Sequence, residues 1–145
     1  MEIRKMTQTD VHQLADLEKI CFSDPWSVSA FEYELNNPLS LWLVAVEDGE
    51  VLGYVGTQTV IDESDMMNIA VLPRCRRQGI AEKLIDVLVD TLMERGSKSL
   101  TLEVRVSNSP AIALYEKLGF VQVGRRPNYY RNPKEDALIL RKEMA

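Results

Sequence analysis

The sequence predicts an α/β fold in which a mixed, mostly antiparallel sheet of about seven strands carries helices on both faces. Three apolar segments joined by tight turns between residues 41 and 72 are typical of an antiparallel meander. Residues 79–94 then change to the periodicity of an amphipathic helix. Strands and helices continue to alternate toward the C-terminus, and this order favours a sheet covered by helices.

The N-terminal segment is predicted to form a short strand and two helices. Residues 1–6 fit a strand, and Thr7–Ile20 fit a helix that Thr7 or Thr9 can cap. After a loop, Ser27 can cap a second helix that continues to Asn36. The apolar stripe of the first helix consists of Val11, Leu14 and Leu17 or Glu18.

Three strands are expected next, at residues 41–47, 51–60 and 66–72. The Asp48-Gly49 pair is a strong hairpin signal between the first two. The long helix that follows ends at Gly96. Its apolar face consists of Ile80, Leu84, Val87, Leu88 and Leu92.

The last elements alternate between strand and helix. Residues 99–106 alternate apolar and polar side chains, which predicts a strand with one apolar side. Residues 109–118 are predicted to form a helix, capped and opened by Ser109-Pro110. Residues 120–124 and 137–140 complete the sheet, and residues 128–130 are predicted to lie in a loop between them.

The segment before the long helix has the features of an anion site. Arg74, Arg76 and Arg77 supply positive charge, and a helix beginning near Gly79 offers free N–H groups and its dipole. Gly79 also lets a ligand approach the backbone closely. The pattern is neither a P-loop nor a Gly-x-Gly-x-x-Gly fingerprint. From spacing alone, a solvated basic loop before a surface helix is an equally good interpretation.

This segment and its surroundings resemble the GNAT acetyltransferases. Arg76-x-x-Gly79-x-Ala81 is similar to their pyrophosphate motif, Gln/Arg-x-x-Gly-x-Gly/Ala, with Ala81 where many members have glycine. It follows Ile69-Ala70-Val71 and precedes Asn108 and residues 113–120, which are similar to a second hallmark of the family. The resemblance covers the whole chain. It implies one GNAT domain over residues 1–145, with acetyl-CoA as cosubstrate and no metal.

Further segments resemble one group within the family, the RimI group of bacterial ribosomal-protein-alanine acetyltransferases. These segments are Pro25-Trp26-Ser27, residues 68–71, residues 102–105, Ser107-Asn108, residues 128–130 and residues 135–137. The resemblance implies that the partner is a ribosomal-protein N-terminus. It specifically implies acetylation of the N-terminal alanine of protein eighteen of the small ribosomal subunit.

The same resemblance implies roles for individual residues. Glu103 would be the general base and Tyr115 the general acid, with Asn108 near the pantetheine. The backbone at Ile69, Ala70 and Val71 would hold the thioester arm. The pyrophosphate would lie on Arg76, Arg77, Gln78, Gly79, Ile80, Ala81 and Glu82.

Acid–base chemistry agrees with an N-terminal amine as the acceptor. With a pKa of ~7.7–8.0, roughly a tenth of it is neutral near pH 7, whereas a lysine amine at ~10.4 is neutral in less than about one part in a thousand. One carboxylate is therefore a sufficient base for the α-amine. Glu103 lies on the polar side of its predicted strand. Without the resemblance, an exposed ion pair between Glu103 and Arg105 is the favoured interpretation.

Several other candidates have ordinary structural interpretations. Tyr115 also fits a core tyrosine, and Asn108 a helix cap. Cys75 lies among arginines where a thiolate could be stabilised, but direct acetyl transfer needs no acyl-enzyme. Cys21 is expected to be a small buried residue. His12, the only histidine, is expected at the surface or in packing.

Aromatic residues in expected loops, Trp26 and Tyr129-Tyr130, are placed by the resemblance at the peptide end of a cleft. Trp26 can also staple the second helix. Asp24 and Glu135 are candidates to contact a positively charged amine or arginine. Two alternative functions remain open: a GNAT enzyme acting on a small amine or lysine, and a non-catalytic acyl-CoA-binding module. The presence of both proposed catalytic residues favours an enzyme.

Charge and composition narrow the partners and the compartment. The formal net charge of −5 argues against a general phosphate-backbone binder, so we expect no direct contact with nucleic acid. Two cysteines without framework spacing indicate a reducing compartment. The N-terminus lacks a secretory signal, and no apolar run approaches the ~20 residues of a membrane helix. We expect a cytoplasmic monomer without membrane contact.

Overall fold

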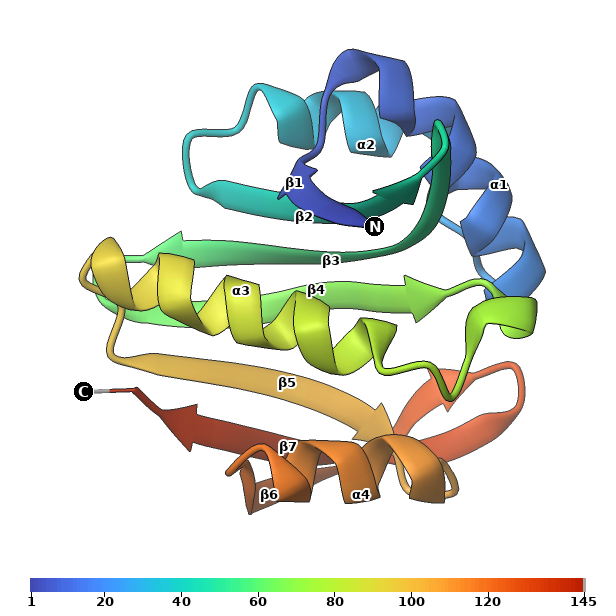
Figure 1. Cartoon of the computed structure of the whole chain (residues 1–145). Coiled ribbons are helices and arrows are strands. Elements are labelled where there is room, and N and C mark those ends of the chain that lie inside the picture. Colours follow the sequence, from blue (N-terminus) through green and yellow to red (C-terminus); the bar gives the residue numbers. More distant parts are fainter. Residues whose placement is uncertain (145) are drawn as a thin grey trace.

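The computed structural model describes residues 1–144, which are built around one sheet with the strand order β1-β2-β3-β4-β5-β7-β6 (Figure 1). Among the strands of residues 1–144, only β4 and β5 are parallel neighbours, and the other pairs are antiparallel. The predicted mixed, mostly antiparallel sheet is confirmed. Its strands are β1 (Glu2–Lys5), β2 (Ser40–Glu47), β3 (Glu50–Val60), β4 (Glu63–Val71), β5 (Ser99–Arg105), β6 (Val121–Arg131) and β7 (Lys134–Glu143).

Helices cover both faces of the sheet, as predicted. α1 (Val11–Cys21) and α2 (Val28–Leu35) pack on one face, and α3 (Ile80–Glu94) and α4 (Ser109–Lys117) on the other (Figure 1). Short 3-10 turns at Gln8–Asp10 and Pro73–Cys75 precede α1 and α3. Each face has its own apolar core, centred on Phe31, Trp42 and Tyr54 beneath α1 and α2, and on Leu84, Leu88 and Leu100 beneath α3.

The sheet opens near its centre because β4 and β5 pair only at one end. The parallel register joins residues 63–65 to residues 99–101, and beyond it the two strands separate (Figure 1). On its other edge, β4 shifts register against β3 between Gly56 and Thr57, which leaves Met67 as an extra residue. Such a bulge bends the strand and re-aims its backbone. The opening between β4 and β5 therefore lies beside a distorted stretch of β4.

Two local expectations were wrong. Residues 128–130 do not form a loop, because β6 continues through them as part of a long hairpin with β7 whose register shifts between Arg126 and Tyr130. The Asp136 carboxylate accepts the Asn128 N–H (2.8 Å), so a side chain takes the place of a ladder bond. Ser109-Pro110 does not cap α4. The interpretation of Asn108 as a helix cap is confirmed instead, because its Oδ1 accepts the Ala111 N–H (3.3 Å).

Other helix starts follow from side-chain caps. Ser27 caps α2, since its Oγ accepts the Ala30 N–H (3.1 Å), as predicted. The first predicted helix begins as a 3-10 turn, in which Asp10 accepts the Thr7 N–H (2.8 Å) and pairs with Arg4. These contacts fix where α1 and α2 begin.

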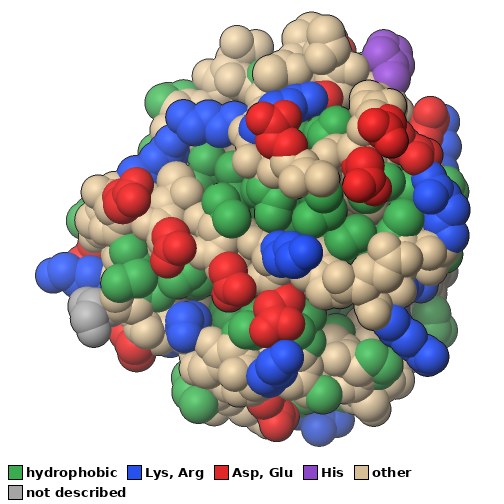
Figure 2. All heavy atoms as spheres, viewed as in Figure 1, with side chains coloured by type: hydrophobic (Ala, Val, Ile, Leu, Met, Phe, Trp, Pro, Cys, Tyr) green, Lys and Arg blue, Asp and Glu red, His purple; other side chains and the backbone are tan. Residues whose placement is uncertain are grey.

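The surface carries charges of both signs. Figure 2 shows acidic and basic side chains interspersed on the face that α3 crosses, and it shows His12 at the surface. Within residues 1–144, no helix is long and apolar enough to cross a membrane.

Candidate active site

A cavity of ≈ 730 Å³ lies where β4 and β5 separate. Leu102 and Tyr115 line it from the side of the sheet that α3 covers, and Trp26 from the side of α1 and α2. Glu103 also lines it, next to Leu102 on β5 and therefore pointing to the opposite face. A cavity reached from both faces can bring two substrates together within the sheet.

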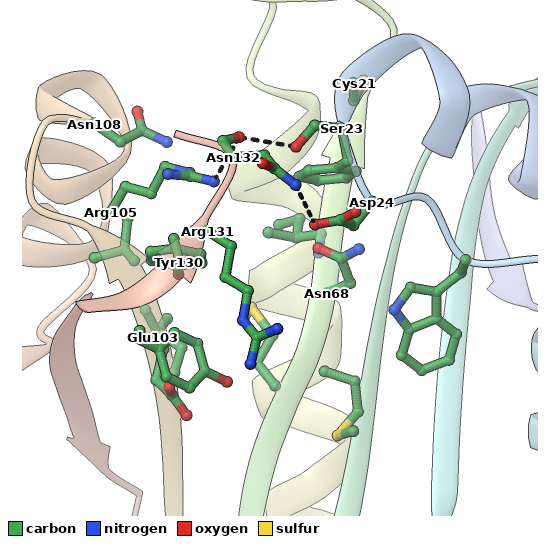
Figure 3. A pocket seen from close by; sticks show the side chains of 18 of the residues that line it. Cys21, Ser23, Asp24, Asn68, Glu103, Arg105, Asn108, Tyr130, Arg131 and Asn132 are labelled. Atoms are coloured by element: carbon green, nitrogen blue, oxygen red, sulfur yellow. Dashed lines mark hydrogen bonds between the residues drawn. The ribbon is translucent and has the colours of Figure 1, made fainter. Parts of the chain in front are cut away.

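The α1–α2 loop and the β6–β7 hairpin are bonded to each other over this cavity. Ser23 Oγ donates to the Asn132 carbonyl (2.9 Å), and Asn132 Nδ2 lies 3.5 Å from Asp24 Oδ2. Figure 3 shows Asn132 between Arg105 on one side and Ser23 and Asp24 on the other, with Arg131 extending into the space below. The two segments together form the outer wall of the site.

Glu103 lines this cavity, and one of its carboxylate oxygens accepts no hydrogen bond within residues 1–144. Its side chain is 28 % exposed, and its Oε2 is buried with no hydrogen-bond partner within residues 1–144. Arg126 Nε lies 3.4 Å from that oxygen. Arg105, the partner considered from the sequence, pairs instead with Glu135 (3.2 Å). The free lone pairs of Glu103 can therefore accept a proton from a group in the cavity.

Three tyrosines line the same cavity as this carboxylate. Tyr115 is buried and packs edge-on against Phe120, and burial raises its pKa to about 12. Burial, and then the charge of Glu103, raise the pKa of Tyr129 and bring that of Tyr130 to about 12. Tyr115 is thus a core tyrosine that also lines the cavity, and its hydroxyl stays protonated throughout the neutral range.

The start of α3 presents an open backbone. Gly79 has φ +79° in the left-handed region, and a Cβ there would meet nothing within 4 Å. Lys83 is the first residue of the helix whose N–H donates within it, to the Gly79 carbonyl (3.0 Å). The N–H groups of Ile80, Ala81 and Glu82 therefore precede the helical hydrogen-bond pattern and form its positive end.

Positive charge near this start comes from fewer arginines than expected. Arg74 is ion-paired with Glu50, whereas Arg76, Arg77 and Gln78 are exposed. The Arg76 guanidinium lies 3.6 Å from Cys21 Sγ. Two arginines and three N–H groups are thus the available contacts for an anion.

The remaining predicted contacts are spread along β4 and α4. Ile69 and Asn108 line the cavity, and Ala70 and Val71 are buried with their backbone beyond the bulge. The Ile69 N–H donates to Asn68 Oδ1 (3.0 Å). Glu82 pairs with Lys117 (3.2 Å) across α3 and α4. The structure therefore brings Glu103, Tyr115, Ile69 and Asn108 to one cavity and leaves residues 76–82 along the start of α3.

The sequence profile of the Acetyltransferase (GNAT) family matches residues 11–120 of the chain. The chain belongs to the GNAT acetyltransferase family. Members of the family use acetyl-CoA, which is the cosubstrate of this GNAT enzyme. The open helix start around Gly79 and the cavity through the sheet fit a long, phosphate-bearing cosubstrate.

Similar proteins include bacterial enzymes of the RimI group, as the resemblance implied. The ribosomal protein bS18-alanine N-acetyltransferase of Escherichia coli (strain K12) is 39% identical over 145 residues, covering 95% of this chain and 94% of that protein. The enzyme of the same name from Salmonella typhimurium is 38% identical, covering 93% and 92%. A crystal structure of the E. coli ribosomal-protein-S18-alanine N-acetyltransferase superposes with a TM-score of 0.92 at 36% identity, covering 99% of this chain and 94% of that one.

Some candidates considered from the sequence lie elsewhere in this GNAT enzyme. Cys75 is buried in the core beneath α3, which removes it as an accessible nucleophile. Cys21, expected to be buried, is partly exposed and lines the cavity. Glu135 already bonds Arg105 and the Ser107 N–H (2.9 Å). Trp26 packs on Phe31 of the second helix and also lines the cavity, so both roles considered from the sequence apply.

Sequence reasoning missed Glu18. It is fully buried on α1 and accepts hydrogen bonds from Trp26 and Asn68, both of which line the cavity. The available signal was a carboxylate on the same helical stripe as Val11 and Leu14. A charged residue at such a position is rarely buried without partners.

Proposed function

We propose that this GNAT enzyme transfers the acetyl group of acetyl-CoA to the N-terminal alanine of ribosomal protein bS18. The observation that carries the proposal is the 39% identity to the E. coli enzyme of that name, extending over 95% of the chain. The cavity between β4 and β5 supports it, because an extended N-terminus and the cosubstrate can enter from opposite faces of the sheet.

In the proposed reaction Glu103 is the base and Tyr115 the acid. As the amine nitrogen bonds to the acetyl carbon and the C–S bond breaks, Glu103 takes the amine proton, directly or through a water. The departing sulfur takes a proton from Tyr115, which regains one from solvent. Glu103 Oε2, which accepts no hydrogen bond within residues 1–144, and the protonated Tyr115 hydroxyl support this assignment.

The chemistry of the acceptor favours an α-amine. Deprotonation near pH 7 costs an N-terminus about 1 kcal/mol and a lysine about 4–5 kcal/mol. A single carboxylate acting as the base is matched to the smaller cost. This supports an N-terminal acceptor over lysine.

Cosubstrate contacts are assigned along the same path. We place the pyrophosphate on residues 76–82, where the free N–H groups and two arginines lie. The thioester arm runs along the backbone of Ile69, Ala70 and Val71 beside the bulge, and Asn108 contacts the pantetheine.

One domain over residues 1–145 is sufficient for this function. The single sheet through residues 1–144 supports it. A ribosomal protein as substrate supports a cytoplasmic location, and we propose that the enzyme works as a monomer.

Mass spectrometry of peptides incubated with acetyl-CoA tests the function. Peptides beginning Ala-Arg, Ser and Met are compared with an Nα-blocked peptide that contains an internal lysine. We expect one acetyl group on the α-amine of the Ala-Arg peptide and none on the blocked peptide. Acetylation of the lysine first would favour the lysine alternative, and acetyl-CoA binding without any product would favour the non-catalytic module.

A further inference from the structure

Glu18 is a buried carboxyl group that the proposed reaction does not use. It lies on α1, is 0 % exposed and faces the sheet. Its Oε1 accepts the Trp26 backbone N–H (2.9 Å). Its Oε2 accepts Asn68 Nδ2 (2.8 Å) and the Tyr54 hydroxyl. One carboxyl group thus joins α1 to the α1–α2 loop, to β3 and to β4.

Two of these partners belong to walls of the cavity. Trp26 lies on the loop whose Ser23 bonds the hairpin at Asn132. Asn68 follows the bulge of β4, and Figure 3 shows it facing the space between Asp24 and Glu103. Because Nδ2 of Asn68 is held by Glu18, its Oδ1 is turned toward the Ile69 N–H (3.0 Å). Glu18 therefore sets the position of the loop and the orientation of Asn68 together.

The surroundings of Glu18 match its ionised form. All three partners donate to the carboxylate. Protonation at Oε2 would require the Tyr54 hydroxyl to become the acceptor, and the neutral carboxyl group would accept the Trp26 and Asn68 bonds less strongly. The titratable groups that face it are Tyr54 from β3 and the Cys21 thiol from α1, with Arg76 beyond the thiol. No cation bonds Glu18 within residues 1–144. Burial without a cation raises its pKa to about 7.

We propose that ionised Glu18 is a positioning residue, which holds the α1–α2 loop and Asn68 in the arrangement that binds the peptide N-terminus, and that protonation of Glu18 releases this arrangement. The inference rests on the proposed function for the identity of the peptide. The link between Glu18 and the two walls is independent of it.

Stability and peptide binding should respond to pH in opposite directions. The folded protein binds the Glu18 proton more tightly than the unfolded chain, since its pKa is raised from the ordinary carboxyl value of 4.5 to about 7. The stability contributed by Glu18 is therefore present at low pH and is lost as pH rises through about 7. Peptide affinity should instead improve over this range. If Glu18 had a purely structural role, stability and peptide affinity would change with pH in the same direction.

The first experiment is an NMR titration of the free protein between about pH 5.5 and 8.5, a window chosen around the expected midpoint. In the wild type, the chemical shifts of the Trp26 backbone N–H and of the Asn68 side-chain amide should change with pH around one shared midpoint near 7, which is set by Glu18. In Glu18→Gln, the chemical shifts of both groups should no longer change around this midpoint. Glu34→Gln is the matched control, because Glu34 is also buried but bonds Gln58 and Asn37, away from the cavity. Its titration should match the wild type.

The second experiment compares the peptide KM of Glu18→Gln with that of the wild type, using an Ala-Arg peptide. We expect a ratio of about tenfold at high pH, where only the wild type is ionised, falling toward one at low pH. The titration of the substrate amine affects both proteins and cancels in this ratio. The acetyl-CoA Kd and the Glu34→Gln enzyme should be unchanged.

Wild-type signals of Trp26 and Asn68 that do not titrate together would overturn the inference, even if Glu18→Gln failed to fold. A Glu18→Gln enzyme with a wild-type peptide KM at high pH would overturn it while leaving the proposed function intact. A shared midpoint with no acetylation of any peptide would refute the proposed function, and with it the peptide-binding role, while confirming the link to the two walls.

Discussion

The guanidinium of Arg105 stacks on Tyr130 and at the same time holds the end of the hairpin. Its Cζ lies 4.2 Å from the Tyr130 ring centroid, and its NH1 donates to the Pro133 carbonyl (2.8 Å). It also pairs with Glu135, whose other oxygen accepts the Ser107 N–H. One side chain of β5 thus joins the β6–β7 hairpin at the cavity to the segment before α4.

Replacement of Arg105 by Lys should raise the peptide KM by about tenfold, because an ammonium group cannot stack and donate in several fixed directions at once. The acetyl-CoA affinity should change little. Arg125→Lys is the matched control, since Arg125 pairs with Asp136 in the same hairpin but is exposed. Steady-state kinetics on both variants check this, and equal effects would contradict a specific role for Arg105.

Gly79→Ala should weaken acetyl-CoA binding more than about tenfold, by placing a Cβ where the cosubstrate approaches the backbone. The positive φ of Gly79 adds a backbone cost of about 1–2 kcal/mol that is unrelated to the ligand. Gly96→Ala separates the two effects, because Gly96 has φ +88° and equally open surroundings at the far end of α3. Calorimetry should give weaker binding for Gly79→Ala alone. Equal affinity in both variants would place the pyrophosphate elsewhere.

Glu103→Gln should lower turnover on the order of a hundredfold and leave acetyl-CoA affinity nearly unchanged, because the amide cannot accept the proton. The defect should shrink as pH rises above the pKa of the amine, when the acceptor is already neutral. Glu63→Gln, at an exposed position on β4, serves as the control. Wild-type turnover at neutral pH would reduce Glu103 to an ion-pair partner of Arg126.

Tyr115→Phe should lower turnover with little change in stability. The ring contact with Phe120 remains, and the hydroxyl has no hydrogen-bond partner within residues 1–144. Tyr54→Phe should show the stability loss of roughly 1 kcal/mol or more that a buried, bonded hydroxyl carries. Denaturant melts and kinetics on the same preparations test both. A Tyr115→Phe protein that is destabilised but fully active would refute the general-acid role.

The pH profile provides an independent check on Tyr115. Burial raises its pKa to about 12, so the phenol remains protonated across the range in which the enzyme can be assayed. Turnover at saturating substrates should therefore show no alkaline decline from this residue. A decline with a midpoint near the ordinary tyrosine value of about 10 that disappears in Tyr115→Phe would mean that the hydroxyl is far less buried.

The order of helices and strands was predictable because each element carries its own periodicity. The apolar face of α3 and the alternation in β5 are local patterns, and both elements form where they were expected. Asn128-Tyr129-Tyr130 was misassigned because Pro127 and Asn128 interrupt a ladder locally. The contact that keeps the hairpin together at this point comes from Asp136 on the other strand.

Local motifs predicted individual residues of the site, but they did not predict which residues would be neighbours there. Glu103 and Tyr115 reach one cavity, but their neighbours are set by the register of the hairpin, which no local pattern encodes. The Glu103–Arg105 pair expected from their shared face is replaced by partners on β6 and β7. The partners of Glu18 lie 8, 36 and 50 residues away in sequence, so only the fold could identify them.

The outermost strand has a consequence for the behaviour of the protein at high concentration. The ladder between β6 and β7 breaks twice, between Gln122 and Gly124 and between Arg126 and Tyr130. A strand that leaves its register cannot offer another chain an even row of N–H and C=O groups. The exposed arginines along β6 also place charged side chains at this edge of the sheet. The hairpin that forms part of the outer wall of the cavity therefore also discourages strand-to-strand aggregation.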